Sequence, residues 1–354
     1  MCLYPKLIKN KKYIANKKNG GIIPTVSDIR TLYVPVGCGK CIECMKKKSR
    51  EWQVRLSEEI REDKNGKMVT LTFNTEALIK LGNRCQKNGY EKDNEICTKA
   101  VRMFLERWRK KHKKSVKHWL VTELGHGKYE HVHIHGIIFT DEPKEEIDRI
   151  WNNGEYRYGN TVIKDKTNGG WVNEQTINYI VKYVKKMDLE HKYYKPIILC
   201  SKGIGKGYLN RQDSKNNKFK DKETREYYVH RNGTKSSLPI YYRNKIYSET
   251  EREKLWINLL DKETRYVLGN EIKLKENWIK INIDGEEWLL DNSEVEYYRQ
   301  LKEARELNER LGYGNNEKNW SREKYENEKR EIIRKKRENK EDNRLWKSED
   351  WCPF

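Results

Sequence analysis

Apolar and polar positions along the first 200 residues of the chain follow two different periods. Stretches that alternate between apolar and polar residues, as half-buried strands do, are 67–74, 117–124 and 130–139. Stretches with apolar residues at helical spacing lie within 38–62, 100–114, 144–151 and 173–187. The order strand, helix, strand, strand predicts an α+β fold in which a central antiparallel sheet is flanked by helices.

Composition divides the chain into four segments. The first, 1–60, carries a cysteine cluster and a basic helix, and 61–200 contains the predicted sheet. A Gly- and Lys-rich extension follows at 201–291, and 292–354 is charged and helix-prone with little to bury. We therefore expect the C-terminal region to be mainly helical and basic.

The charge of the chain indicates a polyanionic partner. Among 354 residues, 75 Lys and Arg oppose 54 Asp and Glu, which leaves a net charge of +21. Such a surplus favours nucleic acid or an anionic membrane surface, although it also occurs in basic proteins that are merely soluble. No window approaches the roughly 18 apolar residues of a spanning helix, and no signal peptide is apparent at the first residues. We therefore expect a soluble, intracellular protein with no membrane partner.

Three histidines alternate along the predicted strand 130–139, at His131, His133 and His135. Because residues two apart share one face of a strand, these side chains project together, while Val132 and Ile134 serve the core. At about 3.3 Å per residue His131 and His135 are about 13 Å apart, too far for both to lie about 2.1 Å from one ion. Adjacent members of the row can share an ion, so this strand supplies two ligands.

A third ligand is available on the neighbouring strand. "VTELG" places Glu123 at the end of that strand, where its carboxylate can face the histidines. Two imidazoles and one carboxylate with open coordination positions suit a catalytic divalent ion. The alternative is a strand that simply exposes its polar residues to water.

Two tyrosines lie four residues apart on the predicted helix 173–187. Tyr179 and Tyr183 then share one helix face, with Lys182 close to both. A nearby ammonium favours the phenolate, and a metal that polarises a phosphate lowers the barrier to attack, so these residues are candidate nucleophiles for phosphoryl transfer from DNA. Pairs with this spacing also occur on ordinary amphipathic helices.

Three cysteines, Cys38, Cys41 and Cys44, follow a C-x-x-C-x-x-C spacing that suits zinc. A closed structural Zn²⁺ site needs four ligands, and Cys2 is the favoured fourth because the apolar-poor N-terminus would gain order from it. Cys200 or a histidine could replace Cys2. An iron–sulfur cluster and three free thiols remain open.

Basic stretches near Lys46, Lys110 and Lys185 gather positive charge around the predicted site, where Lys and Arg would neutralise phosphates. Trp108 or Trp119 could stack on bases. Charged stretches of this kind are also typical of a solvated surface.

Several motifs together resemble a known family. "HIH", followed along the chain by "YIVKY", resembles the HUH endonucleases that start rolling-circle replication. "VPVGCGKCIECMKKKSREWQVRL", "VTLTF", "VTELG", "HVHIHGIIF", "YIVKYVKK", "GIGKGYL" and "LPIYYRNKIY" resemble the replication initiators of gokushovirus-like Microviridae, small single-stranded DNA phages. The resemblance spans roughly 34–247. The family shows Arg-Pro where this chain has His131 and Val132, so we expect His131 to play a supporting role or none.

The resemblance implies an HUH endonuclease-like fold in 61–200, with Mg²⁺ or Mn²⁺ held by His133, His135 and Glu123. Tyr179 and Tyr183 would act in turn. One would nick single-stranded origin DNA to give a 5′-phosphotyrosine and a free 3′-hydroxyl for the host DNA polymerase, and the other would rejoin the displaced strand. The sequence shows no G-x-x-x-x-G-K-[ST] loop, so a host helicase is expected as a partner, in the cytoplasm of the bacterial host.

Two other classes of function remain open. A non-catalytic nucleic-acid-binding protein would use the histidines for structural zinc and the tyrosines to stack on bases. A hydrolytic metal-dependent nuclease would need the ion but neither tyrosine, and a plasmid relaxase would share the metal histidines in another motif order.

Overall fold

The computed structural model describes residues 2–126, 130–154, 157–164, 172–186, 191, 194–275, 278–283 and 286–313. The chain divides into two units. Unit 1 consists of Met1–Met45, Lys218–Arg225 and Tyr247–Phe354, and unit 2 consists of Lys46–Asn217 and Glu226–Ile246. The N-terminal and C-terminal parts of the chain thus belong to the same unit, and the predicted sheet region lies in the other.

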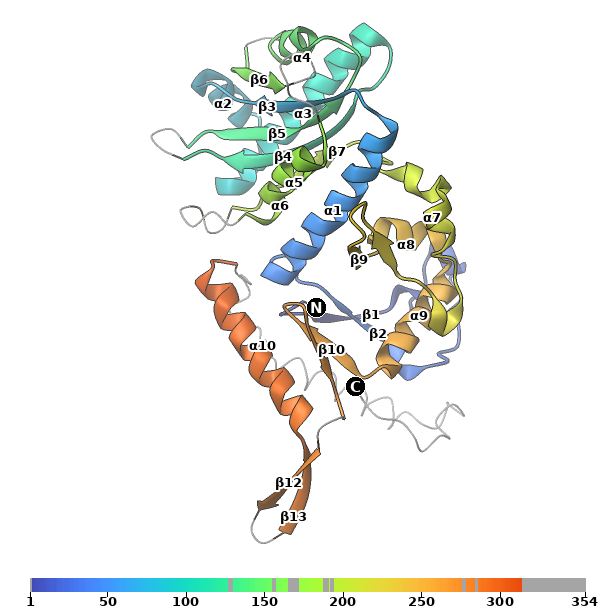
Figure 1. Cartoon of the computed structure of the whole chain (residues 1–354). Helices are drawn as coiled ribbons and strands as arrows, with labels where there is room; N and C mark the ends of the chain where they lie inside the picture. The colour runs from blue at the N-terminus through green and yellow to red at the C-terminus, as the bar shows by residue number, and fades with distance from the viewer. Residues whose placement is uncertain are drawn as a thin grey trace. The chain divides into compact units, whose positions relative to one another are not determined.

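Unit 2 is built on a five-stranded antiparallel sheet (Figure 1). Its strands are β3 (Gly66–Leu71), β4 (Lys117–Leu124), β5 (Val132–Phe139), β6 (Thr161–Lys164) and β7 (Ile198–Cys200), in the order β6-β3-β5-β4-β7. Each pair of neighbours is antiparallel. The predicted fold class, an antiparallel sheet flanked by helices, is confirmed.

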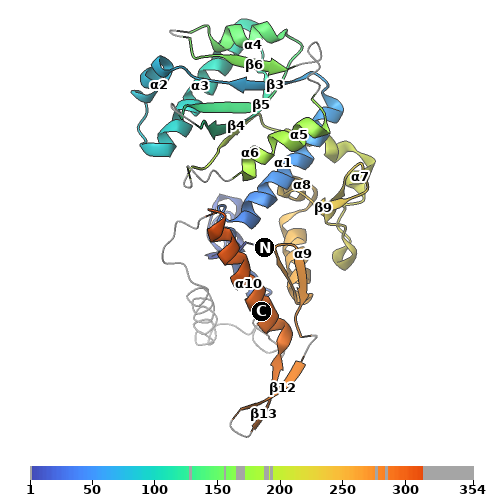
Figure 2. The same ribbon diagram turned by 60° about the vertical axis from the view of Figure 1, so that its left-hand side comes forward.

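Helices cover both faces of this sheet. One face packs on α2 (Thr75–Gly82), α3 (Gly89–His112) and α4 (Lys144–Trp151) through a core that includes Val132, Ile134 and Ile138 of β5. The other face packs on α1 (Ile42–Glu62), α5 (Glu174–Ile180) and α6 (Lys182–Lys185) (Figures 1 and 2). Both faces are therefore buried over most of their length.

The histidine face of β5 is a core face, contrary to the sequence-based expectation. Ile137 and Phe139 continue the row begun by His133 and His135, and both are buried among residues of α1, α5 and α6. His135 itself is only 8% exposed. Alternation alone could not show this, because a second helical layer covers the face that appeared to be solvated.

The helices agree with the predicted stretches, with two differences. The stretch 173–187 forms two short helices, with Val181 as the residue between them, and its apolar stripe is buried as predicted. The short helix α2 was not predicted. It begins after Asn74, whose side chain accepts a hydrogen bond from the backbone N–H of Ala77 and caps the helix.

The Gly- and Lys-rich stretch that follows β7 is anchored on buried carboxylates of α1. Glu58 is 1% exposed and accepts hydrogen bonds from Arg211, at 2.5 Å, and from Tyr228. Glu59 accepts a hydrogen bond of 2.6 Å from the backbone N–H of Gly205. Buried charges are tolerated when they are paired in this way, so the stretch is held as part of unit 2.

Unit 1 consists of hairpins and helices around a smaller core. Its main elements are β1 (Lys6–Lys9), β2 (Tyr33–Val36), α9 (Glu249–Asp261), β10 (Thr264–Val267), β11 (Asn270–Lys273), β12 (Trp278–Ile283), β13 (Glu286–Asp291) and α10 (Asn292–Arg310). The helix predicted from residue 292 is confirmed as α10. It buries more than expected, because Tyr297, Leu301 and Ala304 enter the core of this unit.

The remaining elements are short. Unit 1 also has the 3₁₀ helices η1 (Lys11–Tyr13), η2 (Lys17–Asn19), η3 (Ile29–Thr31) and η6 (Asp221–Glu223). Unit 2 also has η5 (Lys206–Asn210), α7 (Gln212–Lys215), β8 (Tyr227–Val229), β9 (Lys235–Ser237) and α8 (Ile240–Ile246). Among the residues that the structure describes, no helix is both long and apolar enough to cross a membrane.

The contact between β4 and β5 leaves no room for a side chain at Gly136. A Cβ atom there would lie 2.2 Å from the carbonyl oxygen of Trp119, which belongs to the backbone and cannot rotate away. We expect Gly136→Ala to destabilise unit 2 by about 1–3 kcal/mol, measured as a lower midpoint of thermal or urea unfolding. Gly82→Ala is the control, because a Cβ there meets only the flexible end of Lys92. Equal midpoints for both variants would contradict this account.

Candidate active site

The strand register brings the three predicted metal ligands together. Glu123 of β4 lies directly opposite His133 of β5, and Val121 lies opposite His135, so all three polar side chains project from one face. The Glu123 Oε2 atom is 2.9 Å from His135 Nε2 and 3.5 Å from His133 Nε2. One candidate ligand atom from each residue lies within 4.8 Å of the others, which is close enough to surround a single ion.

The other ring nitrogens of both histidines have hydrogen-bond partners. His133 Nδ1 is 3.0 Å from the carbonyl oxygen of His131. Because a carbonyl only accepts, Nδ1 carries the proton and Nε2 of a neutral ring keeps its lone pair for a metal. His135 Nδ1 is 3.1 Å from Thr70 Oγ1 of β3. Nε2 of His135 is buried and makes no hydrogen bond of good geometry in the structure, so the residues present fit a metal ion.

His131 supports the site through its backbone. Its carbonyl accepts hydrogen bonds from His133 Nδ1 and from the backbone N–H of Gly125, both at 3.0 Å. A Cβ atom on Gly125 would lie 2.9 Å from that carbonyl and 3.1 Å from His133 Cε1. The His131 ring is turned to another strand end, with Nδ1 3.2 Å from the carbonyl oxygen of Phe73. His131 is therefore absent from the ligand set.

The carboxylate of Glu123 is held in its charged form. Burial alone would raise its pKa, but hydrogen bonds from His133, His135 and Lys186 outweigh burial and lower the pKa far below the usual range. The Lys186 ammonium lies 2.7 Å from Glu123 Oε1. The site thus keeps a permanent anion that is ready to bind a cation.

The tyrosine hydroxyls meet beside this cluster. Tyr179 Oη and Tyr183 Oη are 2.7 Å apart, and the two rings are perpendicular, with centroids 5.5 Å apart. The Tyr183 ring is stacked on the His135 ring, with centroids 4.4 Å apart and an angle of 3° between the planes. Tyr179 is 48% exposed. Burial and the hydrogen bond with Tyr179 raise the pKa of Tyr183 above its usual value.

The lysine in contact with the cluster is Lys186, which the sequence reasoning missed. Lys182, the predicted catalytic lysine, begins α6 and is exposed. Lys186 bonds Glu123, and its Nζ lies 5.9 Å from the centroid of the Tyr183 ring. Lys186 follows Tyr183 by three residues, as Lys182 follows Tyr179, so the repeated spacing was the signal that could have found it.

Other predicted residues fall into two groups. Trp108 and Trp119 are 1% and 0% exposed, so the expectation that either stacks on bases is wrong: both belong to the hydrophobic cores of unit 2. Cys2, Cys38, Cys41 and Cys44 come together in unit 1 with their sulfur atoms within 4.8 Å of one another. Cys200, the alternative fourth ligand, lies in β7 of unit 2.

Comparison with known proteins defines the class of this domain. Residues 66–188 match the family model of the replication-associated protein ORF2. That segment runs from β3 through α6 and includes both candidate ligand strands and both tyrosines. The segment is thus a replication-associated protein domain.

A curated relative points to the same class at the level of the phage group. The replication-associated protein ORF4 of Chlamydia phage 1 is 27% identical over 172 residues, which cover 45% of this chain and 40% of that protein. The matched part thus spans less than half of the relative's length. No solved structure matches the chain. The resemblance to replication initiators of Microviridae-like phages is confirmed.

Thr70 offers a test of the metal site that leaves every ligand in place. Thr70→Val keeps the β-branched shape but removes the hydrogen bond to His135 Nδ1. We expect the affinity for Mn²⁺ to fall by about 10–100-fold, because the partners of ligating histidines fix ring orientation and tautomer. Titration followed by electron paramagnetic resonance measures the affinity. Thr72→Val is the matched control, since Thr72 Oγ1 bonds the carbonyl of Asn160. A Thr70→Val protein with unchanged affinity would refute the assignment of His135 as a ligand.

Proposed function

We propose that this chain initiates rolling-circle replication by nicking and rejoining single-stranded DNA through metal-dependent transesterification at tyrosine. The observation that carries the proposal is the contact between two parts of the site: the Tyr183 ring stacks on His135 of the ligand cluster while its hydroxyl meets that of Tyr179. A hydrolytic nuclease would need the ligand cluster alone. The replication-associated family of residues 66–188 supports a role in initiation.

The chemistry of the donor set supports a divalent metal held by His133, His135 and Glu123. Mg²⁺ or Mn²⁺ bound there would polarise the scissile phosphate and help to neutralise its developing charge. The residues of the chain orient the reacting groups. The register of β4 and β5 fixes the ligands, and the stacking on His135 fixes the ring of Tyr183 next to them.

The proposed reaction exchanges one phosphodiester for another. A tyrosine oxygen loses its proton and attacks the phosphorus, and the bond from phosphorus to the 3′-oxygen breaks. The 3′-oxygen takes up a proton, and the DNA 5′-phosphate remains joined to tyrosine. The free energy of the ester is conserved, so the second tyrosine can repeat the exchange on the regenerated origin, and the released 3′-hydroxyl can close the displaced strand without ATP.

The proposed partners follow from this product. The 3′-hydroxyl is a primer for the host DNA polymerase, and strand separation falls to a host helicase in the bacterial cytoplasm. Exposed basic residues close to the ends of α1, α3 and α6, among them Lys47, Lys110 and Lys185, would contact phosphates. With the tryptophans buried, the DNA grip proposed here rests on charge.

A covalent product tests the nucleophiles directly. Purified protein is incubated with Mn²⁺ and a pool of 3′-labelled single-stranded oligonucleotides that tile the genome encoding the chain. We expect a labelled, protease-sensitive adduct on a denaturing gel that a chelator abolishes. The adduct should weaken in Tyr179→Phe and Tyr183→Phe and disappear in the double variant, because each tyrosine can supply one attacking oxygen. Tyr227→Phe, on β8, is the control and should react like the natural protein.

Two outcomes would reject this proposal in favour of another. Cutting without an adduct indicates a hydrolytic nuclease that uses water. Binding of the oligonucleotides with no cutting by the natural protein, in the presence of Mn²⁺, indicates a non-catalytic nucleic-acid-binding protein. An adduct that persists in the double variant would show that a different residue is the nucleophile.

The two lysines can be separated by substitution. We expect Lys186→Met to lower the initial rate of adduct formation by at least about tenfold, because it removes the positive charge beside Glu123 and the Tyr183 ring. Lys182→Met removes a charge that is exposed one residue before Tyr183 and should have the smaller effect. Single-turnover kinetics at saturating Mn²⁺ give both rates. The opposite order would restore Lys182 as the catalytic lysine.

A further inference from the structure

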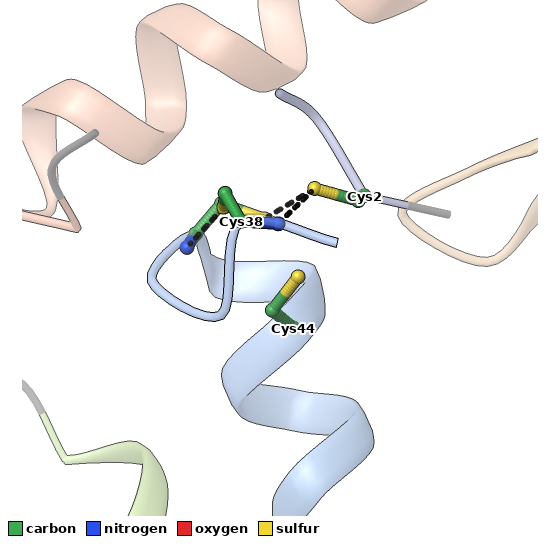
Figure 3. A group of neighbouring side chains, drawn as sticks. Cys2, Cys38 and Cys44 are labelled. Carbon is green, nitrogen blue, oxygen red and sulfur yellow. Dashed lines mark hydrogen bonds between the residues drawn. The ribbon is translucent and has the colours of Figure 1, made fainter. Parts of the chain in front are cut away.

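Four cysteine side chains of unit 1 converge from separate parts of the chain. Cys2 comes from the N-terminal stretch, Cys38 and Cys41 flank the turn before α1, and Cys44 lies in the first turn of α1 (Figure 3). All four sulfur atoms lie within 4.8 Å of one another. The proposed DNA chemistry uses none of these residues.

The spacing of the sulfur atoms is that of ligands around one ion. With a Zn–S bond of about 2.3 Å, the edge of a ZnS₄ tetrahedron is about 3.8 Å. The sulfur atoms of Cys2 and Cys41 are 3.9 Å apart. A disulfide would need about 2.05 Å, and all four cysteines are free thiols in the structure.

Backbone N–H groups point at two of these sulfur atoms. Cys38 Sγ accepts hydrogen bonds from the N–H groups of Lys40 and Cys41, at 3.4 and 3.3 Å. Gly39 has a φ of +72°, the left-handed region that glycine adopts without strain, and this conformation forms the turn. Cys2 Sγ accepts from the N–H groups of Cys38, at 3.2 Å, and Tyr4, at 3.4 Å. Such donors stabilise a thiolate, the form of cysteine that binds metal.

The cluster lies where the N-terminal stretch and the start of α1 pack on α10. Cys41 is fully buried in the core of unit 1, next to Leu3 and Ile42. The backbone N–H of Ile42 donates to Asn308 Oδ1 at 2.9 Å, and Arg305 donates to the carbonyl of Leu3. A metal at this point would join the two segments that α10 holds, so its binding would stabilise the folded unit.

We propose that Cys2, Cys38, Cys41 and Cys44 bind a structural Zn²⁺ ion that fastens the N-terminus of the chain to the start of α1. Four thiolates close the coordination sphere, so the ion has no open position and plays no part in the DNA chemistry. The single point of convergence favours one ion over an iron–sulfur cluster, whose several irons must fit between the thiolates. The site is independent of the His133, His135 and Glu123 cluster, which offers nitrogen and oxygen ligands.

Metal content and a cobalt spectrum test this site. We expect the full-length protein, purified under reducing conditions from zinc-supplemented cells, to contain zinc that a thiol-specific mercurial releases, measured by elemental analysis and a colorimetric chelator. Replacing zinc with Co²⁺ should give the intense visible bands of tetrahedral thiolate coordination, which the nitrogen and oxygen ligands of the other site cannot produce. Cys2→Ser and Cys38→Ser should each lose or shift these bands and lower the midpoint of thermal unfolding.

Cys85→Ser is the matched control. Cys85 is partly buried in unit 2, and its thiol donates to the carbonyl of Leu81, a bond that serine can replace. This variant should keep the cobalt spectrum. The proposal is overturned if the reduced natural protein gives no thiolate–cobalt spectrum, if Cys38→Ser keeps the natural spectrum, or if the protein as purified holds iron and sulfide in place of zinc. The result for the natural protein decides the matter even where a variant fails to fold.

Discussion

The antiparallel register of β4 and β5 is the constraint on which the candidate active site depends. It places Glu123 opposite His133 and sets His135 two residues further along the same face. A slip of one residue would turn one strand's polar side chains to the opposite face, into the core formed with α3 and α4. Gly136 fixes the two strands at close range, because any side chain there would collide with the backbone of β4. Packing thus specifies where the ligands lie.

Burial explains the electrostatic arrangement of the site. The face that carries the histidines runs into the core beneath α1, α5 and α6, so His135 and Glu123 lie close to the apolar interior. A lone carboxylate in this position would favour its neutral form. The two imidazoles and the Lys186 ammonium reverse that preference and keep Glu123 charged. A divalent ion would add to the same stabilisation, which is why a cationic partner suits a site at the edge of a core.

The sequence predicted more of this structure than its composition did. Alternation located β3, β4 and β5 and brought the correct three ligands together, because antiparallel neighbours with a short connection have few possible registers. Spacing also placed Tyr179 and Tyr183 side by side and selected Cys2 for the cysteine cluster. The errors concern tertiary burial. Trp108 and Trp119 are core residues, and Lys186 reaches the site only because the chain continues past the end of α6 beside Glu123.

Under the proposed mechanism, the hydrogen bond between the two tyrosines is also a constraint on their order of action. Within the pair, one hydroxyl donates and the other accepts, and reversing the bond exchanges these roles with little movement, since the oxygens are 2.7 Å apart. The raised pKa of Tyr183 keeps its hydroxyl protonated at neutral pH in the free site, so the residue is a poor nucleophile until bound charge favours the phenolate. Reaction would then require DNA and metal together. Two equivalent hydroxyls, each inactive without the other components, are what a cycle of alternate cutting and joining needs.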